Sequence, residues 1–443
     1  MRFQQKHALE VSAVSLAILE SIAYSFPELS SVLLVFMTIL LVSPMLISRR
    51  LFINSTMMAA LLMIGEWTYV LDDQEIYTLY GIRVFNFSFL TGLLMLCFMV
   101  VSNKPVKISF IIGILYVLAL TIVNIFNFEF QNFLLVIRDL KIYIVLALII
   151  FLSRYMDCFL IVNATVRGAS IYLLAALVLG NKFDYGGGNY YLAQSASVYL
   201  LPALLIVSSI RWKLELAAYW ALYIFILIKG DLFIGGKTII LLALYFLYML
   251  VISNNYVRGV LVVFALFLMS LVPYLNDPIV TYKLSQVVSL FSFDSLLHTK
   301  TSVGNIYGEL YTFMASWSDM GKFLFGGGLG GGVVDTFGVL APWVGVGGYD
   351  FVQYDVGLYT RMHLTFTNIL VKFGLFGLLI FLVYLSRYRQ IVNRAQFYIV
   401  SLPIFLLVGD TNPSTFIATV LLLIASTRSC RESVRPSFTP RAF

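Results

Sequence analysis

Basic side chains at the ends of long apolar runs are the residues of this sequence best suited to hold an anion. They are Arg138, Lys141, Lys229, Lys237, Arg361 and Lys372. Cations that enter from several segments at one level would converge on a phosphate-bearing ligand. Taken singly, each is equally explained by reaching lipid headgroups or by pairing with an acidic neighbour, for which Asp139 and Asp231 are at hand.

The segment from Gly230 to Thr238 ends in Gly-Gly-Lys-Thr and calls for comparison with the nucleotide-binding P-loop. That loop needs Gly, four residues, then Gly-Lys-Ser/Thr, and counting back from Gly236 puts Asp231 where the first glycine belongs. We therefore predict no ATP site. Glycines at a helix start together with Lys237 still favour the approach of a phosphate, and a tight turn into the helix explains them equally well.

His363 is a candidate general base, because an imidazole titrates near neutral pH and this one stands two residues from Arg361. Arg361 offers a planar fork that suits two phosphate oxygens better than a point charge does. A lone histidine before a helix is also explained as a polar surface residue. Competing bases in the same region are Glu309, Asp350 and Asp355.

We expect no metal and no cofactor. Asp72, Asp73 and Glu75 could hold Mg²⁺ or Mn²⁺, but a solvated acidic loop explains them more simply. The other metal-binding or redox-active residue types are scattered: Cys97, Cys158, Cys430, His7, His298 and His363. Neither a zinc spacing nor a disulfide framework can be recognised among them.

The elements that position these residues must be membrane helices. Of the 443 residues, 60% are hydrophobic and 12% charged, about half the charge of a soluble domain. The net charge of +7 is spread between apolar runs rather than gathered on a polar domain, so nucleic acid is not an expected partner. We predict an all-α polytopic membrane protein with about 14 spans, at roughly 8–25, 31–48, 56–71, 84–101, 108–126, 135–153, 164–180, 191–209, 214–229, 238–254, 258–274, 364–386, 396–409 and 414–428.

The distribution of Lys and Arg predicts that both termini are cytoplasmic, because short cytoplasmic loops are enriched in these residues. The N-terminal run, which contains Glu10 and Glu20, is interpreted as a retained first span. The loops on the cytoplasmic side would hold Arg49, Arg50, Lys104, Lys107, Arg154, Arg167, Arg211, Lys213, Arg258, Arg387, Arg389 and Arg394, followed by a basic tail at 428–441.

The stretch 275–362 is far longer than the other loops and falls on the extracytoplasmic side. It contains two glycine clusters among many aromatic residues. A long loop of this composition is typical of a folded functional element rather than of disorder. We expect a single membrane domain over 1–443, in which this loop caps the helices.

Four motifs, in this order, resemble those of the O-antigen polymerase and ligase superfamily of bacterial polysaccharide assembly. Asn189 follows Gly188 in a segment similar to the family's Gly-Asn stretch, and Lys237 stands where the family often has Ser-Arg. The run Phe325–Gly330 is similar to its Phe-Gly-x-Gly-x-Gly stretch. The fourth motif consists of Arg361, His363 and Asn368, followed by Lys372–Gly377. It resembles the family's His-Asn segment and Gly-Leu-x-Gly helix. Asn does not directly follow His363 here.

The resemblance implies a GT-C-like glycosyltransferase of the bacterial inner membrane that acts on undecaprenyl diphosphate-linked sugars at the periplasmic face. It assigns catalysis to Arg361 and His363 and gives the other cations, with Asn189, to the diphosphate. A flippase and a chain-length regulator are implied partners, besides the bilayer. Prepositioned cations would stabilise the charge that gathers on the departing lipid diphosphate.

Three functions fit this sequence. A polymerase adds the growing glycan to a lipid-linked repeat unit, and a ligase uses the same chemistry to attach it to lipid A-core. A flippase or other transporter of lipid-linked sugars would also suit many spans and a cationic cavity. We find no repeated halves, and the charges gather at one face, which favours the enzymes over transport.

Overall fold

The computed structural model describes part of the chain. The described residues are 2–62, 78–79, 82–83, 155–180, 182–185, 188–191, 258–259, 262–263, 302–315, 320–335, 338–340, 358–359 and 365–389, with 115, 119, 122, 136, 139–140, 143–144, 146, 149, 152, 250, 362, 420–421 and 424.

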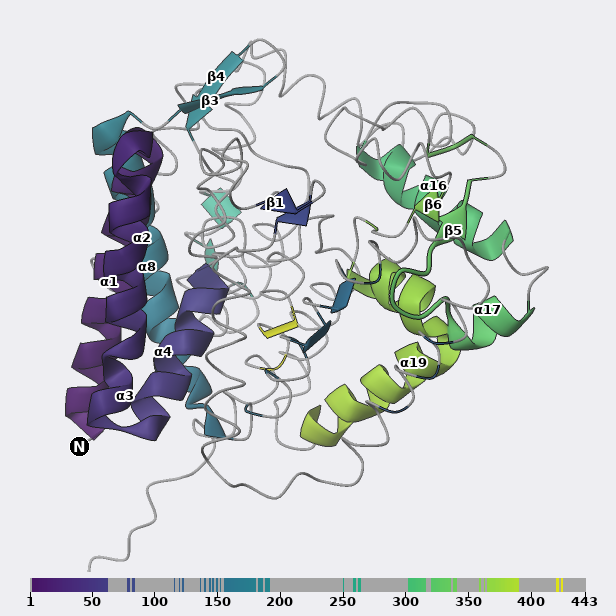
Figure 1. The fold of residues 1–443 in the computed structure, drawn as a ribbon, viewed down its shortest axis with the longest axis horizontal. Coiled ribbons are helices and arrows are strands. Elements are labelled where there is room, and N and C mark those ends of the chain that lie inside the picture. Colours follow the sequence, from purple (N-terminus) through teal and green to yellow (C-terminus); the bar gives the residue numbers. More distant parts are fainter. Residues whose placement is uncertain are drawn as a thin grey trace, which may run out of the picture.

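The N-terminal part is a bundle of helices (Figure 1). Its elements are α1 (Arg2–Ser25), the 3-10 turn η1 (Pro27–Leu29), α2 (Ser30–Val42), α3 (Pro44–Ile47), α4 (Arg49–Leu62) and α8 (Cys158–Leu179). α1 and α8 lie side by side, and Gly168 allows the close approach because a Cβ there would stand 3.0 Å from the Ala13 carbonyl oxygen. Small residues at such a contact are typical of packed membrane helices.

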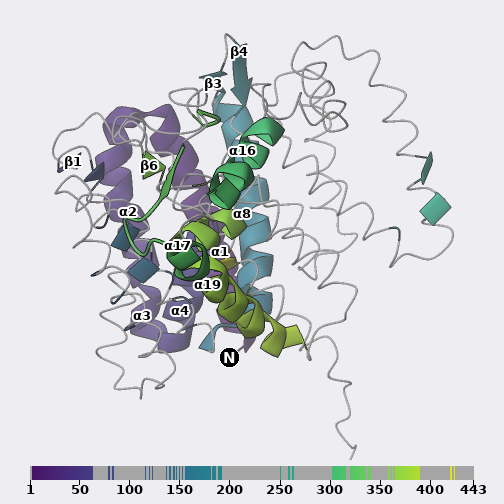
Figure 2. The same ribbon diagram turned by 90° about the vertical axis from the view of Figure 1, so that its right-hand side faces the viewer.

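The C-terminal part combines short elements of the 275–362 loop with one long helix. The loop contains α16 (Ser302–Ala315), α17 (Met320–Phe325) and strands β5 (Val333–Val334) and β6 (Leu358–Tyr359), which pair antiparallel with Val333 opposite Tyr359. α17 packs against α19 (Thr365–Arg389), and α16 contacts both α19 and β5. The described part of the loop is therefore folded onto the helix that follows it, as Figure 2 also shows.

Two further hairpins complete the described elements: β1 (Thr78–Leu79) with β2 (Ile82–Arg83), and β3 (Lys182–Tyr185) with β4 (Gly188–Tyr191). The β3–β4 hairpin projects beyond the end of α8 (Figure 1).

The described part is mostly helical, as predicted. Among these residues, two helices are long and apolar enough to cross a membrane by length and composition, namely α8 and the stretch Phe366–Val383 of α19. Five predicted spans overlap helices: 8–25, 31–48, 56–71, 164–180 and 364–386. Of the other nine, the span 135–153 is described at eight positions, all helical, namely 136, 139, 140, 143, 144, 146, 149 and 152, and the remaining eight spans lie wholly or mostly outside the described residues.

Helix boundaries differ from the predicted ones where a proline interrupts a helix or an acidic side chain caps one. Pro44 lacks a backbone N–H and divides the predicted span 31–48 into α2 and α3. The Asp157 side chain accepts a hydrogen bond from the Leu160 N–H at 3.2 Å and starts α8 at Cys158, six residues before the predicted 164. Arg167 was expected in a cytoplasmic loop, and this prediction was wrong: it lies inside α8 and pairs with Glu10 of α1.

Candidate functional site

α19 is interrupted at Gly374, whose backbone has φ 63° and ψ −169°. A positive φ of this size is readily adopted by glycine and is strained for residues that carry a Cβ. The carbonyl groups of the last turn before such a break lack the intrahelical N–H donors of a continuous helix. Val371 and Lys372 belong to that turn, so their carbonyls need partners from elsewhere.

The glycine loop, residues 326–332, supplies those partners. The Gly327 N–H donates to the Val371 carbonyl and the Gly328 N–H to the Lys372 carbonyl, each at 2.9 Å. The approach is so close that a Cβ on Gly326, which also has φ 78°, would collide with the backbone carbonyl of Lys372. The loop thus docks backbone to backbone against the break in α19.

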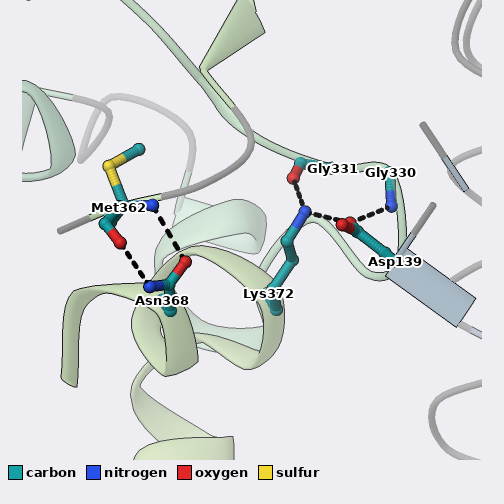
Figure 3. Close-up of polar contacts among 6 residues, drawn as sticks. All are labelled: Asp139, Gly330, Gly331, Met362, Asn368 and Lys372. Atoms are coloured by element: carbon teal, nitrogen blue, oxygen red, sulfur yellow. Dashed lines mark hydrogen bonds and ion pairs between the residues drawn. The ribbon is translucent and has the colours of Figure 1, made fainter. Parts of the chain in front are cut away.

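A buried ion pair fastens the docked loop (Figure 3). The Lys372 ammonium donates to the Asp139 carboxylate and to the Gly331 carbonyl at 2.6 Å. The same carboxylate oxygen of Asp139 accepts from the Gly330 N–H at 2.8 Å. Lys372 and Asp139 are each 1% exposed, so both charges are removed from water and each needs the other.

A contact between two aromatic rings also joins the helical segment around Asp139 to α19. Tyr143, four residues after Asp139 and also helical, meets Phe373 edge-on with ring centroids 5.0 Å apart. Residues four apart share a helix face, so one face of this segment contributes both the carboxylate and the ring.

The start of α19 holds the backbone of the predicted catalytic segment. The Asn368 side chain accepts from the Met362 N–H at 2.9 Å and donates to the Met362 carbonyl at 2.5 Å (Figure 3). Met362 is fully buried and stands between Arg361 and His363 in the sequence. Asn368 therefore fixes the backbone of Met362, the residue that lies between the predicted cation and the predicted base in the sequence.

Glu309 is fully buried and bonds to the first turn of α19. Its carboxylate accepts from the Thr367 hydroxyl at 2.9 Å, and Thr367 is itself buried. At 0% exposure the Glu309 carboxylate is shielded from water. Glu309 acts here as a support that connects α16 to α19.

The predicted site residues fall partly within the described structure. Lys372 pairs with Asp139, an acidic neighbour that the sequence analysis named as the alternative to a phosphate-bearing ligand. Contact between Lys372 and a diphosphate stays a prediction. Asn189 lies in β4, opposite Asp184 of β3. The remaining candidates lie outside the described residues: Arg138, Lys141, Lys229, Lys237, Arg361, His363, Asp350 and Asp355.

Within the described ranges no group of three or more His, Cys, Asp or Glu side chains is placed to hold a metal ion. The acidic loop at 72–75 lies outside these ranges.

Sequence reasoning missed the roles of Asp139, Thr367 and Gly374. Asp139 was considered only as a neutralising neighbour, and its bond to the Gly330 N–H had no local signal. Gly374 was interpreted as part of a continuous span. The six residues from Lys372 to Gly377 contain two glycines, a composition that weakens a helix and could have indicated a break.

Comparisons with protein-family profiles, with curated proteins and with solved structures give no match for this chain.

We expect the Asp139–Lys372 pair to behave as a buried charge pair in a double-mutant cycle. Asp139→Asn or Lys372→Met alone leaves one buried charge without its counterion and should lower stability by about 3–5 kcal/mol. The combined variant should recover a large part of that loss, because no charge remains unpaired. Thermal unfolding in detergent measures all four proteins.

Lys6→Met is the matched control, since Lys6 lies 4.0 Å from Glu10 with its side chain 37% exposed, and Glu10 keeps Arg167 as its counterion. Its effect should stay within about 1 kcal/mol. If the stability losses of the two single variants simply added in the double variant, the two buried charges would not interact, which contradicts the expectation.

Gly326→Ala should destabilise the protein far more than Gly338→Ala. Both glycines have positive φ, 78° and 66°, so alanine strains the backbone at both. A Cβ at Gly326 also collides with α19, whereas at Gly338 nothing lies within 4 Å. The same thermal unfolding assay compares them, and equal losses would show that the docking of the loop on α19 is not tight.

Proposed function

We propose that this protein is a polysaccharide polymerase of the O-antigen polymerase type. It transfers a growing glycan from undecaprenyl diphosphate to the terminal sugar of a second lipid-linked repeat unit, at the periplasmic face of the bacterial inner membrane. The proposal includes a single GT-C-like domain of about 14 spans with both termini in the cytoplasm. The two long apolar helices α8 and α19 support the membrane location.

The observation that carries the proposal is the meeting of two motifs on which the family resemblance rests. Phe325–Gly330 and Lys372–Gly377 are separated by more than forty residues, yet the amides of Gly327 and Gly328 bond the carbonyls of Val371 and Lys372. Such an arrangement gives both motifs a shared structural reason to contain glycine. It also brings the large outer loop to the helix that follows Arg361 and His363.

In the proposed reaction the acceptor sugar hydroxyl attacks the anomeric carbon of the glycan on undecaprenyl diphosphate. The new glycosidic C–O bond forms as the anomeric C–O bond to the diphosphate breaks, and His363 accepts the hydroxyl proton. Negative charge gathers on the leaving diphosphate, where Arg361 stabilises it together with Arg138, Lys141, Lys229 and Lys237.

The structure supports a positioning role for Asn368 in this reaction. Its two hydrogen bonds hold the backbone of Met362, which lies between Arg361 and His363 in the sequence, against the start of α19. Lys372 lies one helical turn further along, so the Met362 clamp and the ion pair to the glycine loop share one stretch of helix (Figure 3).

The assay that tests the proposal uses purified protein in liposomes with undecaprenyl diphosphate-linked repeat units. A ladder of lengthening glycans on a gel is the expected product. Arg361→Ala should abolish the ladder while the variant remains folded and inserted. Transfer to lipid A-core alone would identify a ligase, and the absence of any covalent product would exclude both enzymes and favour transport.

Asn368→Ala should lower kcat by about 10²-fold with a smaller change in KM, because a misplaced catalytic segment loses transition-state contacts rather than substrate binding. Asn54→Ala is the matched control, since buried Asn54 also holds a backbone group, the Asp157 N–H at 3.0 Å, but in the N-terminal bundle. It should lower stability and leave kcat per folded protein unchanged. Equal kcat losses in both variants would remove Asn368 from the site.

A further inference from the structure

Phe325 at the end of α17 carries an apolar surface that the protein does not bury. Its side chain is 43% exposed, and its ring lies against Phe376 of α19, which is 53% exposed, with centroids 6.0 Å apart. A single exposed aromatic residue has many explanations. An exposed pair shared between a loop element and a long apolar helix indicates one continuous surface.

That surface continues along α19 as Phe376, Leu379, Ile380 and Val383, all of which are exposed. Their spacing of three, four and seven residues places them on one helix face. They belong to the stretch Phe366–Val383 that is long and apolar enough to cross a membrane. Lipid chains are the occupant that fits an apolar stripe of this length on such a helix.

The contact with α17 lies deep along the helix. Phe376 comes ten residues after Phe366, where the apolar stretch of α19 begins, and two residues after the break at Gly374. It therefore lies in the interior of the apolar stretch rather than at either end. Figures 1 and 2 agree that α17 lies below α16 and at the height of the middle of α1 and α8, not beyond their ends.

The backbone beside Phe325 meets the condition for irregular chain at membrane depth. Non-helical backbone is tolerated there only where protein satisfies its polar groups. The amides of Gly327, Gly328 and Gly330 donate to α19 and Asp139, and the Gly331 carbonyl accepts from Lys372. Gly328, Gly330 and Gly331 are also buried.

We infer that residues 320–332 form a re-entrant element, which enters the outer leaflet beside α19 and presents Phe325 to the lipid chains together with Phe376. The outer loop is then partly a membrane element rather than wholly a cap in the periplasm. This inference requires α19 to cross the membrane and does not depend on the polymerase reaction.

The test places a nitroxide spin label at Phe325→Cys, in full-length protein whose native cysteines are replaced by alanine. The protein is reconstituted in vesicles of phosphatidylethanolamine and phosphatidylglycerol. Power-saturation EPR then measures collision with oxygen, which concentrates in hydrocarbon, and with a nickel chelate, which stays in water. Phe376→Cys is the lipid control, and Asp184→Cys in the projecting β3–β4 hairpin is the water control.

The Phe325 label should match the Phe376 label, with high oxygen and low nickel accessibility. Nickel accessibility equal to that at Asp184 would overturn the inference by placing α17 in water. Low accessibility to both reagents would also overturn it, because a second copy of the chain would then cover the surface. A second variant with benzoylphenylalanine at 325 keeps an aromatic side chain, and its photo-crosslinks should be to lipid; crosslinks to protein alone would refute the inference.

Discussion

A helix interrupted inside an apolar protein leaves carbonyl groups that only another part of the chain can bond, and much of the C-terminal region is organised around that need. α19 breaks at Gly374, and the glycine loop provides the missing N–H groups to Val371 and Lys372. The two backbones approach closely enough that side chains would prevent the contact. Asp139 and Lys372 then hold the loop in place with a charge pair that water does not screen.

The predicted active segment depends on the same helix. Asn368 fixes Met362, Thr367 bonds Glu309, and Lys372 reaches the glycine loop, all within two turns of α19. Displacement of the loop would therefore act on the start of α19 and on the peptide between Arg361 and His363. One stretch of helix thus connects the glycine loop to the backbone of Met362.

The features predicted from sequence are those with a local or periodic cause. Apolar runs of about twenty residues predicted α8 and α19, because crossing hydrocarbon requires that length. The start of α8 was misplaced although Asp157 is a suitable N-cap, since Asn163 and Arg167 interrupt the apolar sequence after its first five residues. Lys372 was assigned to a diphosphate, and an acidic neighbour was considered only as the alternative partner. The break at Gly374 and its filling by residues 326–332 arise from contacts between distant segments, for which one sequence carries no periodic signal.

The ion pair also has a consequence for how the chain is made. Asp139 leaves the ribosome 233 residues before Lys372. At about 5–20 residues per second, the interval is on the order of tens of seconds. Throughout that time the carboxylate has neither its ammonium nor the Gly330 amide. The helical segment around Asp139 therefore reaches its final position only after Lys372 has been synthesised, and a ribosome that stops before Lys372 leaves the Asp139 carboxylate without its counterion.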